Sequence, residues 1–387
     1  MLTLDRTDLY RALEDLNFYS YGTLTSQELL AVAGACGLSD ENRARYRLEE
    51  AKGAVVVALR YGDGLYAPPV WAKVYERAGE ATAKVAIARF ARANWYAEIR
   101  DRLKKLSQKL RFSLEGQAAA NGEPVPPMRL WQRVTNSGLP EKPFAFAAAL
   151  GSQGRNQLLI ARRSSLKADT FPPYSSAVLL GLLLCPVPID MGQSDTAPAD
   201  AGHDVAKALS ARGTYPLCGS CRKCIDACPS GALSAGRQAA QSCAPNLVTP
   251  SLATPSLAKG PWNGSTNNEN ARVVSFSRTA CVQHWTARVG EMPREVAATL
   301  PNRLYGCDSC LDVCPYFLTD PAAHTELGLL GPELPAEFFL QASTEEIKRN
   351  LRGSTLDMAW MSIEAFRRNA LLASQWCPDD VLGYCPH

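Results

Sequence analysis

The chain has little net charge, no long apolar run and no sign of a secretory start. Its 387 residues carry a formal net charge of +3, which argues against a protein that binds nucleic acid through its overall charge, although a local basic face stays compatible with it. The longest apolar stretch, 177–189, is interrupted by Pro186 and Pro188 and is too short to cross a bilayer. Residues 1–18 contain Asp, Arg and Glu and lack the cationic start and apolar core of a signal peptide. We therefore expect no membrane partner.

The composition is that of a folded protein whose cysteines serve metal. With 46% hydrophobic and 20% charged residues, the chain is typical of a soluble protein of two or more domains. It has 13 cysteines, an odd number, and seven of them crowd into two short runs. This pattern favours metal thiolates over a disulfide framework. Free thiols kept for metal imply a reducing compartment, so we expect a cytoplasmic protein.

Two cysteine runs carry the strongest signal. Residues 218–229 read CGSCRKCIDACP, the C-x2-C-x2-C-x3-C-P spacing with which bacterial ferredoxins bind iron–sulfur clusters. Residues 307–315 read CDSCLDVCP and repeat the last three cysteines of that pattern. A zinc site is the alternative, but zinc uses pairs of ligands and needs neither this spacing nor the trailing proline. The runs therefore predict two clusters and one-electron transfer.

The spacing also predicts which cysteine binds which cluster. In a two-cluster ferredoxin the fourth cysteine of a run ligates the other cluster. The first cluster is thereby assigned Cys218, Cys221, Cys224 and Cys314, and the second Cys228, Cys307 and Cys310. The second run lacks its leading cysteine, because Leu304 stands there, so the fourth ligand is Cys281 or Cys243. We favour Cys281, which lies in a helix-like stretch before the second run, whereas Cys243 lies in a Pro- and Ser-rich segment. The remaining thiols are expected to be inert: Cys36, Cys185, Cys377 and Cys385.

Hydrophobic periodicity predicts an α+β protein. The expected strands are 53–59, 158–161 and 178–184, and the expected helices are 9–18, 26–35, 81–112, 336–341, 345–351 and 361–374. Within 359–373, the spacing of Trp360, Ile363, Phe366 and Leu371 predicts core packing. We expect an N-terminal α/β domain at 1–205, ending in a linker at 190–204, a ferredoxin-like domain at 206–320 with an inserted loop at 241–277, and a helical C-terminal region at 321–387.

Several stretches, together with the cysteines, resemble the epoxyqueuosine reductase family. Residues 302–310 (NRLYGCDSC) are similar to the family's NRIYGCDDC, and residues 281–286 (CVQHWT) to its CISYLT, whose cysteine ligates the second cluster. Residues 150–156 (LGSQGRN) resemble the family's LGWIGKN, which lies beside the corrinoid. Residues 352–354 (RGS) and 367–373 (RRNALLA) are similar to the family's C-terminal RGS and RNALIA stretches. The resemblance extends over about residues 50–375.

The resemblance implies a function and a cofactor set. Members of this family reduce epoxyqueuosine to queuosine in tRNA, using two [4Fe-4S] clusters and cobalamin bound by the N-terminal domain. It implies an external electron donor, such as a flavodoxin or ferredoxin, and Cys281 as the fourth ligand of the second cluster. The residues that it implies in cofactor binding are Gly151, Gln153, Gly154, Asn156 and Gln283.

The chain departs from the family where the substrate chemistry takes place. The family has an acidic proton donor in a DSAPVLEK-like segment, but residues 134–142 read VTNSGLPEK, so the acid's position falls on Thr135 or Asn136. The ARGRDYH segment appears as ARANWYA at 91–97, which keeps Tyr96 and loses the histidine, and Ser152 replaces the tryptophan of LGWIGKN. The candidates for proton supply are Tyr96, Asn136 and Glu141. A packed tyrosine, an ordinary turn at 136–137 and a solvated glutamate are the alternative interpretations.

Two other functions stay open. The chain could be a divergent family member that reduces another substrate, or a ferredoxin-like electron relay without cobalamin. A tRNA substrate needs basic contacts to phosphate. The candidate pairs are Lys104–Lys105, Arg162–Arg163, Lys348–Arg349 and Arg367–Arg368.

Overall fold

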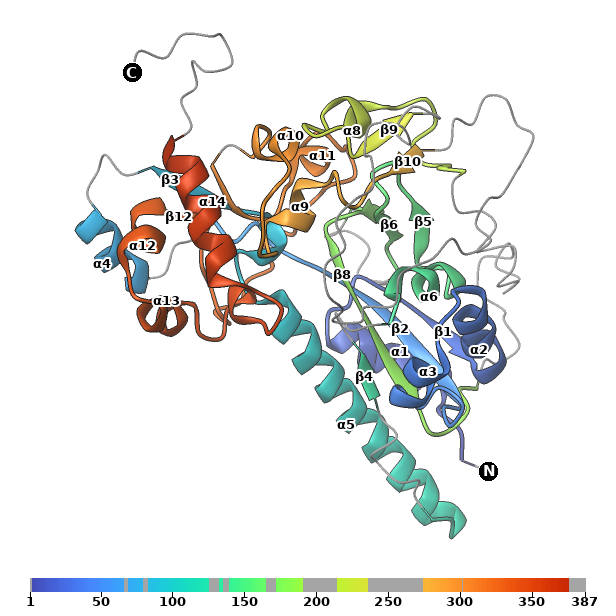
Figure 1. Cartoon of the computed structure of the whole chain (residues 1–387). Helices are drawn as coiled ribbons and strands as arrows, with labels where there is room; N and C mark the ends of the chain where they lie inside the picture. The colour runs from blue at the N-terminus through green and yellow to red at the C-terminus, as the bar shows by residue number, and fades with distance from the viewer. Residues whose placement is uncertain are drawn as a thin grey trace. The chain divides into compact units, whose positions relative to one another are not determined.

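The chain forms two compact units (Figure 1). A computed structural model describes residues 2–65, 69–78, 83–124, 132–134, 139–164, 172–190, 214–235, 274–300 and 302–375. Unit 1 comprises Met1–Arg60, Ile99–Cys221 and Gly236–Val274, and unit 2 comprises Tyr61–Glu98, Arg222–Ala235 and Ser275–His387. Each unit combines separate stretches of chain, whereas the sequence predicts contiguous domains at 1–205, 206–320 and 321–387, which stay a prediction. No helix in the described ranges is long and apolar enough to span a membrane.

Unit 1 contains a four-stranded antiparallel sheet in the order β1-β2-β8-β4. The strands are β1 (Ser20–Thr25), β2 (Gly53–Arg60), β8 (Val178–Cys185) and β4 (Gln132–Val134). Every residue of β2 is buried, which agrees with its valine-rich sequence and its central position. The strands predicted at 53–59 and 178–184 are therefore confirmed. Because the sheet is antiparallel, this unit is α+β and differs from the α/β N-terminal domain expected from the sequence.

Helices and a second sheet complete unit 1. The helices are α1 (Arg6–Asp15), α2 (Ser26–Ala35), α3 (Asp40–Arg45), α6 (Glu141–Ala147) and α5 (Trp95–Asn121), which belongs to this unit from Ile99 onward. The second sheet, antiparallel in the order β5-β6-β7, consists of β5 (Gly151–Gln153), β6 (Leu159–Arg162) and β7 (Tyr174–Ser175). Helix α2 and strand β6 were predicted correctly to within one residue. The N-terminus of α2 is explained by a capping box between Thr25 and Glu28.

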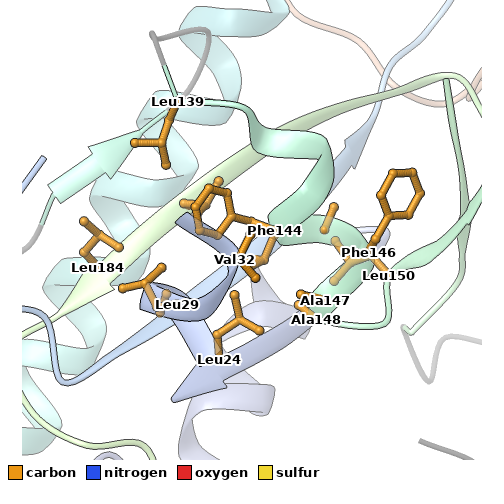
Figure 2. Packing of buried hydrophobic residues seen from close by; sticks show 14 of the residues in the cluster. Leu24, Leu29, Val32, Leu139, Phe144, Phe146, Ala147, Ala148, Leu150 and Leu184 are labelled. Carbon is orange, nitrogen blue, oxygen red and sulfur yellow. The ribbon is translucent and has the colours of Figure 1, made fainter. Parts of the chain in front are cut away.

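The two faces of the larger sheet pack against different helices, because successive side chains of a strand point to opposite sides. Val56 contributes to the core under α2 and α6, and Figure 2 shows Leu29, Val32 and Phe144 gathered between these helices and the sheet. On the other face, a Cβ at Gly181 would come 2.8 Å from the Leu103 side chain. Glycine at this position therefore lets α5 lie close to the sheet.

Unit 2 is built around a three-stranded sheet in the order β11-β3-β12. The central strand β3 (Lys84–Ile87) pairs in parallel with β11 (Arg303–Tyr305) and antiparallel with β12 (Glu333–Pro335). The surrounding helices are α4 (Pro69–Ala78), η1 (Arg89–Ala91), α12 (Ala336–Gln341), α13 (Thr344–Leu351), η4 (Thr355–Asp357) and α14 (Ile363–Gln375). The helix predicted at 81–112 was wrong in its first part, since β3 occupies 84–87 and α5 begins only at Trp95.

Short elements surround the cysteines. They are α8 (Lys223–Asp226), β9 (Leu233–Ala235), β10 (Val274–Phe276), α9 (Val282–Trp285), α10 (Arg294–Ala297) and α11 (Ser309–Asp312). Strand β10 pairs with β9, so the end of the loop predicted at 241–277 is a strand. The rest of that loop lies outside the described residues, as does the predicted linker after Asp190.

The core of unit 2 is rich in aromatic side chains and includes only some of the C-terminal residues predicted to pack in it. Phe366 of α14 is buried among Phe339 and other apolar side chains. Trp360 is 50% exposed and Leu371 is 45% exposed, so the prediction of core packing was wrong for these two. Trp360 precedes the helix, and Leu371 lies five positions after Phe366, which turns it about 140° away around the helix axis.

We expect two glycine substitutions in unit 1 to have opposite effects on stability. A Cβ at Gly22 of β1 would lie 2.2 Å from the backbone oxygen of Ala148, so Gly22→Ala should lower the free energy of unfolding by about 1–3 kcal/mol. Gly34 lies in α2 with no heavy atom within 4 Å of its Cβ position, so Gly34→Ala should raise it by about 0.5–1 kcal/mol. Urea denaturation measures both, and equal midpoints for the two variants would contradict the close approach at Gly22.

Candidate functional site

A glycine turn leads from β11 into the second cysteine run. Gly306 has a φ of 85°, and a Cβ there would lie 2.3 Å from the Ala88 side chain. Its N–H donates a hydrogen bond to Thr286 Oγ1 at 3.1 Å. Only glycine fits both the backbone conformation and the space. The turn therefore fixes where Cys307 begins relative to β3 and the segment after α9.

The side chain of Asn369 in α14 ties together the two segments that carry Cys281 and Cys307. Asn369 is fully buried, and its Nδ2 donates to the backbone oxygens of Thr286 at 2.9 Å and Leu304 at 2.8 Å. Thr286 follows α9, at whose N-terminus Cys281 lies, and Leu304 is the middle residue of β11. One carboxamide thus holds both cysteine-bearing segments against the same helix.

Five of the predicted ligands lie in neighbouring elements of unit 2. Burial raises the pKa of the Cys310 thiol, and the thiols of Cys307, Cys281, Cys228 and Cys224 raise it further. Burial likewise raises the pKa of Cys281, and the thiols of Cys307 and Cys228 act in the same direction. Helix α8, which contains Cys224, packs against α11, which contains Cys310. Cys224, which the spacing assigns to the first cluster, therefore lies near the thiols assigned to the second.

The described residues contain no group of three His, Cys, Asp or Glu side chains that would hold a single metal ion. A single zinc ion, with sulfur ligands at about 2.3 Å, would require its four sulfurs to lie about 3.8 Å apart. An iron–sulfur cluster places its thiolates on separate iron atoms. The thiols that affect Cys310 include the three others assigned to the second cluster, and four cysteines are the donor set that a [4Fe-4S] cluster requires.

Charged groups surround the second run. Asp308 accepts a hydrogen bond from the backbone N–H of Arg89 at 2.8 Å, while the Arg89 guanidinium pairs with Asp312 and, at 3.2 Å, with Asp63. Burial raises the pKa of Asp308, and its Oδ1 is buried with no hydrogen-bond partner in the described structure. Arg303 donates from Nη1 to Cys307 Sγ at 2.8 Å. One sulfur of the second run therefore accepts a hydrogen bond directly from a guanidinium.

The first cysteine run contacts the glycine-containing stretch of unit 1. The backbone N–H of Arg155 donates to Cys218 Sγ at 3.4 Å, and its guanidinium donates to the backbone oxygen of Gly219 at 2.8 Å. The same guanidinium lies 5.2 Å from the centre of the Tyr215 ring. Sequence reasoning missed both Arg155 and Arg303 as neighbours of cysteine sulfur. The available signal was their presence inside the stretches 150–156 and 302–310.

The two glycines predicted to bind a cofactor have structural reasons to be there. A Cβ at Gly151 in β5 would come 2.1 Å from the backbone oxygen of Ile160 in β6. A Cβ at Gly154 would come 2.6 Å from Asn156 Oδ1. Close packing within the β5–β6 hairpin therefore explains both glycines, and their role toward a cofactor stays a prediction.

The two polar residues of that stretch predicted to bind a cofactor, Gln153 and Asn156, have different hydrogen-bond partners. Gln153 donates to Gln157 Oε1 at 2.6 Å. Asn156 accepts a hydrogen bond from the backbone of Leu158 at 3.2 Å, while its buried Nδ2 has no partner within the described ranges. Asn156 thus offers an unused donor inside unit 1. Cys185 is buried and Cys36 is half-buried, and Cys377 and Cys385 lie outside the described residues.

Gln283 belongs to unit 2, whereas the other predicted cofactor residues belong to unit 1. Its side chain hydrogen-bonds to Tyr305, and its Oε1 would lie 3.1 Å from a Cβ at Gly306. Burial raises the pKa of Tyr305 to about 12, so the phenol is neutral at neutral pH. Gln283 therefore supports the glycine turn before the second cysteine run.

The candidates for proton supply are only partly described. Tyr96 lies in the first turn of α5 in unit 2, and Glu141 begins α6 in unit 1; both are half-buried. Asn136 and Thr135 lie outside the described residues, as does Cys243. The catalytic roles of these residues stay predictions.

One of the basic pairs proposed for RNA binding has an internal role. Arg367 donates to the backbone oxygen of Ala342 at 2.7 Å. Arg368 donates to the backbone oxygens of Trp285 at 2.6 Å and Gly290 at 2.8 Å. This pair therefore holds the loops beside α12 and α9. Lys105 forms an ion pair with Asp101 at 2.8 Å.

Comparisons with known proteins support the resemblance seen in the sequence. No family model matches the chain. The epoxyqueuosine reductase of Bacillus anthracis is 25% identical over 335 residues, which cover 84% of this chain and 64% of that protein. The epoxyqueuosine reductase of Listeria monocytogenes is 26% identical over 332 residues, with the same coverage. The chain thus spans less than two thirds of the length of these curated relatives.

Solved structures show the same fold. The epoxyqueuosine reductase of Streptococcus thermophilus has a TM-score of 0.56 at 18% identity, covering 95% of this chain and 80% of that chain. An epoxyqueuosine reductase with an epoxyqueuosine-modified tRNA-Tyr stem loop matches with a TM-score of 0.56 at 19% identity and the same coverage. A Bacillus subtilis structure with equal scores has its catalytic aspartate loop swung out of the active site. The mixed α+β fold and the resemblance to epoxyqueuosine reductases, which are oxidoreductases, are therefore confirmed.

We expect Asn369→Ala to destabilise the region around the second cysteine run. The substitution leaves the backbone oxygens of Thr286 and Leu304 without the donor that they have now, and each buried group left unsatisfied costs about 1–3 kcal/mol. The free energy of unfolding, measured by urea denaturation, should fall by about 2 kcal/mol or more. The matched control is Asn350→Ala, which removes one bond to Glu346 within α13 and should cost about 1 kcal/mol. Equal losses in the two variants would refute the tethering role of Asn369.

Proposed function

Because curated epoxyqueuosine reductases are homologues of this chain over most of its length, we propose that it is an iron–sulfur and cobalamin oxidoreductase that reduces epoxyqueuosine to queuosine in tRNA. The observation that carries the proposal is the convergence of cysteine-bearing elements in unit 2: α8 packs against α11, and Asn369 joins the segments that carry Cys281 and Cys307. Four cysteines brought together in a homologue of these enzymes are the donor set that a [4Fe-4S] cluster needs.

The first proposed cluster is supported by the spacing of its cysteines, and the second is supported also by the structure. The first is assigned by spacing to Cys218, Cys221, Cys224 and Cys314. The second is assigned to Cys228, Cys281, Cys307 and Cys310, which interact as described above. When bound, such clusters supply one-electron transfer from an external donor, which we propose is a flavodoxin or ferredoxin. Hydrogen bonds from Arg155 and Arg303 to cysteine sulfur stabilise the thiolate forms that metal binding requires.

Cobalamin is proposed on narrower grounds. The buried, unused Nδ2 of Asn156 is a donor that a polar ligand can satisfy, and we propose that it acts with Gly151, Gln153, Gly154 and Gln283. When bound, cobalamin supplies a redox centre that can react with carbon. The role of the surrounding residues is to orient the substrate and exclude water.

The overall reaction defines what the chain must contribute. Converting an epoxide to an alkene breaks both carbon–oxygen bonds, consumes two electrons and two protons, and releases water. Negative charge develops on oxygen as the ring opens, so a proton donor must lie close to it. Of the three candidates, Tyr96 and Glu141 are proposed to supply the proton, whereas Asn136 is proposed to donate a hydrogen bond, because a carboxamide is not acidic enough to give up a proton. The half-buried positions of Tyr96 and Glu141 are compatible with it.

A specific observation favours a second candidate function. Thr135 or Asn136 occupies the position of the family's acidic proton donor, and neither side chain can replace a carboxylic acid. The second candidate is therefore a divergent reductase that uses the same electron path for another substrate. An electron relay without cobalamin is the remaining alternative.

We expect Cys281→Ser to remove one cluster and Cys243→Ser to leave both in place. In anaerobically purified full-length protein, Cys281→Ser should lose about half of the iron and acid-labile sulfide, because a [4Fe-4S] cluster needs four thiolates. Cys185→Ser, which changes a buried thiol of β8, is the control and should keep the wild-type content. Loss of iron in Cys243→Ser but not in Cys281→Ser would contradict our assignment, and wild-type protein without sulfide would refute the proposed function.

A second experiment separates the candidate functions. Anaerobic protein is mixed with cobalamin and reductant, and gel filtration tests whether a corrinoid absorption band co-elutes with iron. The protein is then given epoxyqueuosine-containing tRNA, and nucleoside mass spectrometry measures queuosine. Both results should be positive for an epoxyqueuosine reductase. Corrinoid retention without queuosine favours another substrate, and a protein with clusters but without corrinoid retention is an electron relay.

A further inference from the structure

The guanidinium of Arg303 donates hydrogen bonds to two residues of the second cysteine run. Its Nη1 donates to Cys307 Sγ at 2.8 Å, and its Nη2 donates to Ser309 Oγ at 2.9 Å. The hydroxyl of Ser309 also lies 3.6 Å from Cys307 Sγ. The guanidinium therefore binds one sulfur directly and orients a second polar group beside it.

The backbone of Arg303 is fixed independently of this contact. Arg303 begins β11 and pairs with Ala86 of β3, while the next residue, Leu304, is fully buried in the core of unit 2. The backbone oxygen of Leu304 is held by Asn369. Strand pairing and the buried neighbour therefore fix the backbone of Arg303, from which the side chain reaches Cys307.

This hydrogen bond differs in charge from the one that Cys218 of the first run accepts. Cys218 accepts its hydrogen bond from the backbone N–H of Arg155. That donor is neutral, whereas a guanidinium is always protonated. A charged donor forms a stronger hydrogen bond to an anionic acceptor than a neutral donor does.

We infer that Arg303 is a positioning residue that raises the reduction potential of the second cluster, the one assigned to Cys228, Cys281, Cys307 and Cys310. The inference depends on the proposed function, because it requires Cys307 to bind that cluster. Reduction adds one negative charge to a cluster, and a cation that is hydrogen-bonded to a ligand sulfur stabilises the reduced form more than the oxidised one.

Other charges near this cluster act together with Arg303. Asp308 lies between Cys307 and Ser309 in the chain and is half-buried, and its negative charge opposes reduction. The guanidinium of Arg89 lies 3.9 Å from the Asp308 carboxylate and offsets part of that charge. Because these groups are the same in wild type and variants, a substitution of Arg303 isolates its own contribution.

The test is an EPR-monitored redox titration of the full-length, anaerobically purified protein. Arg303→Gln should make reduction of one cluster at least tenfold less favourable, which is a fall of 59 mV in the midpoint potential of a one-electron couple, and leave the other potential unchanged. Arg303→Lys keeps the positive charge but loses the paired hydrogen bonds to Cys307 and Ser309, so its shift in midpoint potential should be smaller. Arg349→Gln, on an exposed position of α13, is the matched control and should shift neither potential.

The variant Cys281→Ser identifies the signal of the second cluster by removing it. Iron and sulfide content are measured for every variant. If Arg303→Gln loses a cluster, Arg303→Lys and Ser309→Ala provide the measurement, and each should lower the same potential. Unchanged potentials in variants that keep both clusters would overturn the role of Arg303, and so would an equal shift of both potentials. Wild-type protein without clusters would instead refute the proposed function.

Discussion

The arrangement of the second cysteine run depends on one buried carboxamide. Asn369 joins α14 to the end of α9 and to β11 through two hydrogen bonds to backbone oxygens. Cys281 lies at the start of α9, and Cys307 lies two residues after β11. The thiols that we propose bind one cluster come from separate segments of the chain, so their relative positions have to be set by a group that contacts both segments. Asn369 meets that requirement because its single amide nitrogen donates twice.

Electrostatics distinguishes the surroundings of the two cysteine runs. A neutral backbone N–H faces Cys218, whereas a guanidinium faces Cys307 and a half-buried carboxylate, Asp308, follows it. Charge beside a ligand sulfur is one of the means by which a protein sets the potential of an iron–sulfur cluster. Two clusters with similar ligands can therefore differ in potential, which gives electrons a preferred direction between them.

The homology and the departures from it concern different parts of the chemistry. The cysteines of both runs and the NRLYGCDSC stretch are retained, while the segment that carries the acidic proton donor in relatives has Thr135 and Asn136. The chain also covers only 64% of the length of the curated relatives. In the proposed function, electron transfer and proton supply belong to separate segments, so one can be kept while the other changes. This separation is why the electron path is the better supported half of the proposed function.

Local patterns in the sequence were enough to predict the helix at 26–35 and the buried strand at 53–59. The cysteine assignments also come from local spacing, and they stay a prediction. Each depends on residues close together in the chain, such as the Thr25–Glu28 capping box. The late start of α5, the exposure of Trp360 and the internal role of Arg368 could not be read in this way. They depend on strand pairing and on contacts across long separations, as when Arg368 binds a carbonyl 83 residues away. Periodicity records which face of an element is apolar, but which partner meets that face is settled only when the chain folds.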